Sequence, residues 1–155
     1  MAVRVREGDA RDRDFAIETA RRFAAFGPPP WRSAHEVVAG EVRCLDEFFD
    51  GRMPGCSLLI AEDEEPARLG FAFLEPHVDY FSGEPHGHLG MIAVTDAAEG
   101  RGAGSALMRA AEEWCRGRGY AVLTLNVFEA NTRARMLYER LGYNVETLRY
   151  TKSLE

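Results

Sequence analysis

The sequence predicts a mixed α/β (α+β) fold in which helices cover a central mixed β-sheet. Two observations predict it. The chain has 155 residues, a length that suits one domain. Along it, segments with the alternation of a β-strand are interleaved with segments that have the periodicity of an amphipathic helix. We therefore expect residues 1–155 to form a single domain with the element order βααβββαβαβ.

The N-terminal third predicts one strand and two helices. Residues 2–7, "AVRVRE", alternate apolar and charged side chains as a half-buried strand does. Residues 9–26 repeat apolar side chains at helical spacing until "GPPP" ends the pattern. Ser33 can cap a second helix, which keeps an apolar stripe until Gly51.

The middle of the chain predicts three strands. Residues 56–62 and 68–76 are short apolar runs joined by the turn-forming "DEEPA", so we expect a β-hairpin. Residues 77–88, "HVDYFSGEPHGH", predict a strand end followed by a loop. Residues 89–94, "LGMIAV", predict the next strand.

The C-terminal third predicts two further helix–strand pairs. Residues 103–117 carry an apolar helical face, and residues 120–128 are apolar enough for a strand buried on both faces. A helix capped by Asn131 should end at Gly142. The alternation of residues 143–154 predicts a last strand.

Composition excludes several classes of function. The net charge of −6 argues against nucleic acid as a partner. No apolar stretch approaches the ~20 residues of a membrane span, and the arginines and aspartates near the N-terminus do not suit an export signal. Cys44, Cys56 and Cys115 are odd in number and far apart, which predicts reduced thiols and neither a disulfide framework nor a metal site. We expect a cytoplasmic protein without a membrane contact.

The stretch "EGRGAGSAL", residues 99–107, is typical of an anion-binding loop. Glycines at 100, 102 and 104 bare the backbone amides immediately before a helix, whose N-terminus carries partial positive charge. A Walker loop is excluded because no lysine is near, and a dinucleotide fingerprint is disfavoured because the spacing is G-x-G-x-G. Phosphate or pyrophosphate is the ligand that this stretch predicts.

Two motifs together resemble those of the GNAT acetyltransferase superfamily. "IAVTDAAEGRGAGSALMRAAEEW" resembles its [RQ]-x-x-G-x-[GA] acetyl-CoA motif, and "NVFEANTRARMLYERLGY" resembles its N-x-x-A-x-x-x-Y-x-x-x-G-[FY] motif. The resemblance implies acetyl-CoA as co-substrate and transfer of acetyl by direct attack of a primary amine, on a small molecule or a protein. Glu99 stands where the family has Arg or Gln, and Arg101 is the nearest arginine that could pair with it.

The resemblance also implies which residues bind the cofactor. In the family the strand before the loop carries a bulge and splays from its neighbour, so the backbone of Ile92, Ala93 and Val94 should bind the thioester arm. The Val94 N–H would donate to the oxyanion. Tyr138 matches the tyrosine that protonates the CoA sulfur, and Asn131 matches an asparagine that touches the CoA arm. The loop residues expected at the pyrophosphate are Glu99, Gly100, Arg101, Gly102, Ala103, Gly104 and Ser105.

The general base is less defined by the sequence. His88 occupies the position where some protein-acetylating members carry a glutamate, although "HGH" also suits a solvated loop. The alternatives are Glu75, His77, Asp79 and Tyr80, or ordered water.

The acceptor site should lie opposite CoA. Acidic side chains that could line a cationic site, or simply form a solvated helix face, are Glu36, Glu41, Asp46, Glu47 and Asp79. A non-catalytic acyl-CoA-binding regulatory module is the alternative function, and a homodimer through the last strands is a further expectation from the family.

Overall fold

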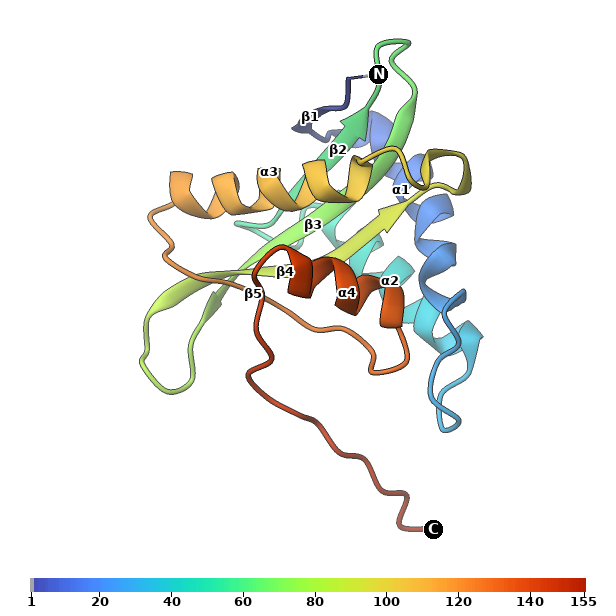
Figure 1. Ribbon diagram of the computed structural model, residues 1–155, viewed down its shortest axis with the longest axis vertical. Helices are drawn as coiled ribbons and strands as arrows, with labels where there is room; N and C mark the ends of the chain where they lie inside the picture. The colour runs from blue at the N-terminus through green and yellow to red at the C-terminus, as the bar shows by residue number, and fades with distance from the viewer. Residues whose placement is uncertain (1) are drawn as a thin grey trace.

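The computed structural model describes residues 2–155 and contains a five-stranded mixed sheet (Figure 1). The spatial order of the strands is their order in the chain, and all neighbours are antiparallel except the parallel pair of the fourth and fifth. The strands are β1 (Arg4–Glu7), β2 (Ser57–Glu62), β3 (Arg68–Val78), β4 (Pro85–Val94) and β5 (Leu123–Leu125). The helices are α1 (Arg13–Ala20), α2 (Ala34–Phe49), α3 (Ala103–Gly117) and α4 (Thr132–Arg140), with short 3₁₀ turns η1 (Ala10–Asp12), η2 (Arg21–Ala24) and η3 (Asp96–Ala98).

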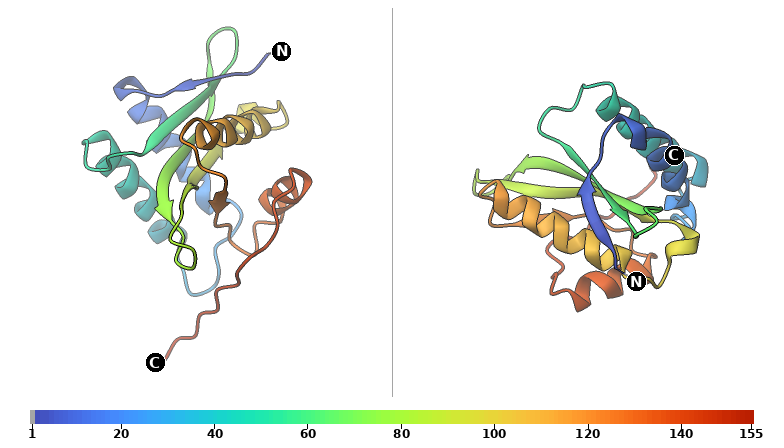
Figure 2. Two further views of the ribbon diagram at one scale, coloured as in Figure 1. Left: turned by 90° about the vertical axis from the view of Figure 1, so that its left-hand side faces the viewer. Right: turned by 90° about the horizontal axis from the view of Figure 1, so that it is seen from above.

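Helices cover both faces of the sheet. α1 and α2 lie on one face, and α3 and α4 lie on the other (Figure 2). Each face has its own apolar core: Phe71 and Phe73 of β3 belong to the cluster under α1 and α2, whereas Ala72 and Leu74 belong to the cluster under α3. This alternation along β3 is the two-residue period of a strand covered on both sides.

Side-chain caps begin two of the helices where the sequence predicts them. Ser33 Oγ accepts a hydrogen bond from the Glu36 amide at 3.0 Å, and Glu36 returns one by accepting from the Ser33 amide at 2.9 Å. Asn131 Oδ1 accepts from the Ala134 amide at 3.2 Å at the start of α4. Both caps satisfy amides that a first turn leaves without partners, which is why the helices begin there.

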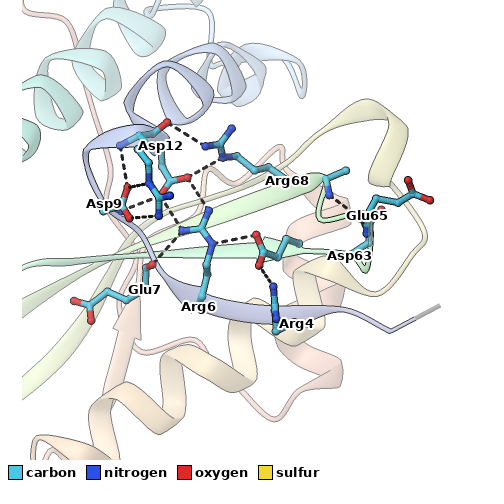
Figure 3. Close-up of polar contacts among 11 residues, drawn as sticks. Arg4, Arg6, Glu7, Asp9, Asp12, Asp63, Glu65 and Arg68 are labelled. Carbon is cyan, nitrogen blue, oxygen red and sulfur yellow. Dashed lines mark hydrogen bonds and ion pairs between the residues drawn. The ribbon is translucent and has the colours of Figure 1, made fainter.

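An ion network fixes the N-terminal strand to η1 and β3 (Figure 3). Asp12 is fully buried and accepts from Arg6, at 2.9 and 3.0 Å, and from Arg68 at 2.8 Å. Arg6 also donates to Glu62 of β2 at 3.0 Å. Burial acts to raise the pKa of Asp12, but these arginines and the Asp9 amide outweigh it and hold the pKa well below its usual range.

The structure corrects the sequence prediction in the middle of the chain. Half of residues 77–88 are strand: β3 ends at Val78, where the sequence predicts a strand end, but β4 begins already at Pro85, so the loop is limited to residues 79–84. Cross-strand pairs such as His77 with His86 extend the hairpin past the point where Gly and Pro predicted its end.

The two strands predicted at the C-terminus also differ. Residues 120–128 contribute only the three-residue β5, which is half-buried at the sheet edge and not covered on both faces. Residues 143–155 form no strand and leave the body of the protein, with Val145, Leu148 and Tyr150 exposed (Figure 1). Alternation is present there, but no strand in the structure pairs with it.

None of the helices formed by residues 2–155 combines the length and apolarity needed to cross a bilayer.

Candidate active site

β4 carries a bulge at Gly90 and then separates from β5. Phe73 of β3 pairs with Met91 and Leu74 with Leu89, so Gly90 has no partner in the register. β5 pairs with β4 only at Gly87–Leu89. The bulge and the separation that the family resemblance implies are therefore both present, and the C-terminal half of β4 has an open side.

The register decides which backbone groups face that open side. The Thr95 amide donates to the Leu69 carbonyl at 2.9 Å. Because hydrogen-bonded and non-hydrogen-bonded pairs alternate in an antiparallel ladder, the polar groups of Ala93 point to β3 and those of Ile92 and Val94 point away from it. Val94 is thus placed to present its N–H to a ligand between β4 and β5, whereas Ala93 is occupied within the sheet.

The glycine loop ends in a helix N-terminus with no side-chain cap. Gly100 and Gly102 have φ values of +77° and +84°, in the left-handed region that favours glycine, and Gly102 is the N-cap of α3. No side chain of the described residues caps α3. Gly104 lies inside the first turn of the helix. The amides from Gly102 to Ser105 are therefore a set of unpaired donors at the positive end of α3, suited to an anion.

Glu99 is paired with two arginines that come from other segments of the chain. It forms an ion pair with Arg22 of η2 and a second with Arg133 of α4, at 3.1 Å. Hydrogen bonds from Arg22 and Arg133 lower the pKa of Glu99, so it is ionised. The expectation that Arg101 pairs with Glu99 is wrong, because Arg101 pairs with Asp63 at 3.1 Å.

α4 places Tyr138 in the apolar layer beside the start of α3. Tyr138 is 7 % exposed and belongs to the same cluster as Ala103 and Leu107. Burial raises the pKa of Tyr138 to about 12, so its hydroxyl stays protonated at neutral pH. A protonated phenol can donate a proton to a leaving group that comes within hydrogen-bond distance of it.

Three neighbouring strands contribute a polar cluster on the face covered by α1 and α2. Glu75 and His77 of β3 lie opposite His88 and His86 of β4, and Thr124 of β5 lies beside His88. Thr124 Oγ1 is 2.8 Å from His88 Nδ1 and 3.1 Å from His86 Nε2. The sequence predicted His88, Glu75 and His77 as alternatives for one role, and the structure brings all three together.

The bulge provides the space for Glu75. A β-carbon at Gly90 would lie 2.3 Å from Glu75 Oε2, so the carboxylate lies directly over the glycine. His77 Nε2 is 3.7 Å from Glu75 Oε1, and the rings of His77 and His88 stack with centroids 4.3 Å apart.

Two members of this region have displaced pKa values. Burial, together with the nearby His77 and His86, lowers the pKa of His88 to about 4, so this ring is neutral at pH 7. Burial and the charge of Glu75 raise the pKa of Glu41, on α2, to about 7.

The other predicted acidic and aromatic residues have local roles. Glu36 caps α2, Asp46 pairs with Arg13 at 2.8 Å, and Asp79 accepts from the Ser82 amide at 2.7 Å in the hairpin turn. Tyr80 is 92 % exposed at the tip of that turn. Glu47 is exposed on α2. Glu41 is the member of the predicted acidic set whose pKa is raised by the charge of Glu75 in the polar cluster.

Sequence reasoning missed Thr124, His86 and Arg22 as members of the site. Thr124 sits in a stretch that resembles a core strand, and its role depends on pairing between β4 and β5. Arg22 lies 77 residues from Glu99 in the chain, so no local spacing predicts their contact.

Comparison with known proteins identifies the family of the chain. The sequence profile of the Acetyltransferase (GNAT) family matches residues 19–143. The chain is 32 % identical over 135 residues to a mycothiol acetyltransferase of Propionibacterium freudenreichii subsp. shermanii, covering 87 % of this chain and 41 % of that protein. It is 29 % identical over 110 residues to the uncharacterized N-acetyltransferase YhfO of Bacillus subtilis, covering 70 % of this chain and 74 % of that one.

A solved structure shows the same fold. The putative acetyl transferase from Pyrococcus furiosus superposes with a TM-score of 0.80 at 23 % identity, over 99 % of this chain and all of the other. The chain spans only about two fifths of the mycothiol acetyltransferase. The profile match nevertheless covers most of the sequence, and the chain belongs to the GNAT acetyltransferase family.

Proposed function

We propose that this chain transfers the acetyl group of acetyl-CoA to a primary amine. The observation that supports it most is the open side of β4 beyond Leu89, which ends at the uncapped N-terminus of α3. A strand with free backbone groups and a helix N-terminus in series suit a ligand that carries an amide-containing arm and a pyrophosphate.

Each end of acetyl-CoA has a candidate partner. The amides from Gly102 to Ser105 donate hydrogen bonds to the pyrophosphate oxygens, and Arg22 and Arg133, which both pair with Glu99, offset its negative charge. Val94 donates its N–H to the thioester carbonyl as negative charge develops there. Asn131 and the backbone of Ile92 line the CoA arm.

The reaction needs one base and one acid. The neutral amine forms a C–N bond to the thioester carbon, the C–S bond breaks, and CoA leaves as a thiolate. Tyr138 supplies the proton that the thiolate takes up. The proton of the ammonium substrate passes to water through the polar cluster of His88, Glu75 and His77, in which Thr124 holds His88 Nδ1. Because the pKa of His88 is lowered to about 4, this ring relays the proton and does not retain it. This assignment of the base rests on the position of the cluster beside the Gly90 bulge.

The acceptor is an amine that approaches from the face covered by α1 and α2. Because several relatives are named mycothiol acetyltransferase, the acceptor of those enzymes is the first compound to test. Polyamines, aminoglycosides, amino acids and peptide N-termini follow. Release of free CoA thiol measures transfer to each amine.

Thermal unfolding with acetyl-CoA, CoA, NAD and ATP in parallel tests the cofactor. At about a hundredfold excess over Kd, a ligand that binds only the native state should stabilise it by about 2.7 kcal/mol. We expect acetyl-CoA and CoA to do so. A shift with NAD or ATP alone would refute the proposal. A shift with CoA but no thiol release with any amine would instead indicate the non-catalytic acyl-CoA-binding module.

We also propose a homodimer of a cytoplasmic enzyme. β5 is a short edge strand, and the exposed Leu148, Tyr150 and Leu154 would share one side of the C-terminal segment if it were extended. If this segment paired with β5 of a second copy, the pairing would cover the open edge of β5 and the exposed apolar side chains of the segment. Light scattering should give twice the chain mass, and a chain ending at Tyr143 should be monomeric.

A further inference from the structure

The polar cluster on β3 and β4 has the composition of a transition-metal site. One nitrogen each of His77 and His88 and one oxygen of Glu75 lie within 4.8 Å of one another. The three residues lie on two strands and come together only through the pairing of β3 with β4, so they do not form a recognisable metal-binding motif in the sequence. Two imidazoles and a carboxylate are a donor set that Zn²⁺ accepts in proteins, with a fourth position left for water or another ligand.

Thr124 orients His88, one of the three candidate metal ligands. The Thr124 hydroxyl is oriented to donate to the Gly87 carbonyl, at 3.4 Å. We assign the tautomers in which its oxygen accepts N–H from His88 Nδ1 and from His86 Nε2, since both nitrogens lie within hydrogen-bond distance of it. This leaves the Nε2 lone pair of His88 for a ligand, and a hydrogen bond from the second ring nitrogen is the usual way in which metal-binding histidines are oriented.

The same assignment accounts for an unusual buried atom. His86 Nδ1 is buried and has no hydrogen-bond partner among the described residues. If His86 donates Nε2–H to Thr124, Nδ1 carries only a lone pair, so no N–H is left unpaired. His86 and Thr124 thus fit a supporting layer behind His88.

We propose that Glu75, His77 and His88 bind one Zn²⁺ per chain, with Thr124 as a positioning residue. The His77 and His88 rings are stacked at 9°, and an imidazole nitrogen binds a metal in the plane of its ring, so one ring has to turn. His77 can turn, because 42 % of its side chain is exposed, whereas His88 is held by Thr124.

Metal binding would compete with acetyl transfer. The ion would use the same lone pairs and carboxylate that we propose for accepting and relaying the substrate proton. Zn²⁺ should therefore inhibit the enzyme reversibly, and a chelator should restore activity. Binding itself does not depend on acetyl transfer, so each proposal can fail without the other.

Calorimetric titration of Zn²⁺ into the chelator-treated chain, without acetyl-CoA, tests the site. We expect saturation at one ion per chain. His77→Ala should abolish this binding, and His35→Ala, which removes an exposed histidine of α2 outside the cluster, should leave it unchanged. Absence of saturable binding in the native chain, or equal binding by His77→Ala and His35→Ala, would overturn the proposal.

Thr124→Val separates positioning from ligation. It keeps all three donors and removes the hydroxyl that orients His88, so Zn²⁺ affinity should fall by ~10- to 100-fold. Circular dichroism verifies that each variant is folded. In nitrogen NMR of the native chain, the ring signals of His77 and His88 should move on addition of Zn²⁺ while those of His35 do not. Unmoved His77 and His88 signals at saturation would place the ion elsewhere and refute the site.

Discussion

Glu99 Oε1 lies 3.1 Å from Arg133 Nη1, which joins the glycine loop to the first turn of α4. The same carboxylate pairs with Arg22 of η2, so one side chain connects three segments around the N-terminus of α3. This arrangement explains how a carboxylate can occupy the position that is Arg or Gln in the acetyl-CoA motif that the sequence resembles. The negative charge of Glu99 is neutralised by Arg22 and Arg133, and these ion pairs place both arginines beside the glycine loop.

Glu99→Gln tests whether that carboxylate opposes the binding of CoA. Removing a negative charge beside the proposed pyrophosphate site should tighten CoA binding by a few-fold, roughly 2- to 10-fold, at low salt and less at high salt. Calorimetry at two salt concentrations measures it. Glu113→Gln, an exposed change on α3, is the control. Weaker binding by Glu99→Gln would show that holding the arginines matters more than repulsion.

Tyr138→Phe tests the acid. Loss of the proton donor should lower kcat by ~10²-fold or more, with a smaller change in KM for acetyl-CoA. Steady-state kinetics with thiol detection give both values. The matched control is Tyr143→Phe, whose hydroxyl donates to Glu112 at 2.8 Å and should affect stability more than turnover. Equal kcat for Tyr138→Phe and the native chain would exclude Tyr138 as the acid.

Gly102→Ala tests the bare loop. Gly102 has φ of +84°, where an L side chain is strained by roughly 1–2 kcal/mol, and the added methyl group stands beside the amides proposed to bind pyrophosphate. We expect weaker CoA binding together with a lower melting temperature. Gly117→Ala, at the end of α3 where nothing lies within 4 Å of a β-carbon, should change neither. Undiminished CoA affinity in Gly102→Ala would argue against the loop as the pyrophosphate site.

Gly90→Ala tests whether the position of the Glu75 carboxylate over Gly90 matters for activity and for Zn²⁺ binding. The new β-carbon would lie 2.3 Å from Glu75 Oε2 and 3.3 Å from Phe73 Cδ2. The flexible carboxylate can move away, and the Phe73 ring has to shift by only a few tenths of an ångström, so the cost in stability should be small. We expect a nearly unchanged melting temperature with lower kcat and weaker Zn²⁺ binding. Gly40→Ala on α2, where a β-carbon would be 3.8 Å from Arg43, controls for the substitution itself. Native kcat and native Zn²⁺ affinity in Gly90→Ala would show that the position of Glu75 is unimportant.

The features that sequence predicted well are those with local causes. The caps at Ser33 and Asn131 and the glycine loop depend on residues within one turn of each other, so their spacing in the chain carries the information. The bulge was expected only through resemblance to a family. Its position at Gly90 became visible in the register with β3.

The polar cluster could not be predicted from residue spacing, because it depends on the one-residue shift in register that the bulge in β4 introduces. After the bulge, Leu89 and Met91 face opposite sides of the sheet although both have odd numbers. Only this shift puts His88 on the same side as Glu75 and His77. The strand predicted for the C-terminal segment is wrong for the opposite reason. Its alternation is a local pattern, but a strand also needs an edge strand to pair with, and β5 is only three residues long.

Asp12→Asn tests the ion network of β1, and its effect should depend on pH. The folded-state pKa of Asp12 is lowered, so its contribution to stability is complete well above the unfolded value of about 3.9 and is lost as pH falls from there toward the folded value. At pH 7 the variant leaves Arg6 and Arg68 facing a neutral amide in a buried setting and should lose about 2–4 kcal/mol of unfolding free energy. Below about pH 4 the gap to the native chain should narrow. Urea unfolding at pH 7, 5 and 3 measures it, with Asp14→Asn, an exposed neighbour on α1, as the control. A gap that stays constant across these pH values would show that the ionisation of Asp12 does not stabilise the fold.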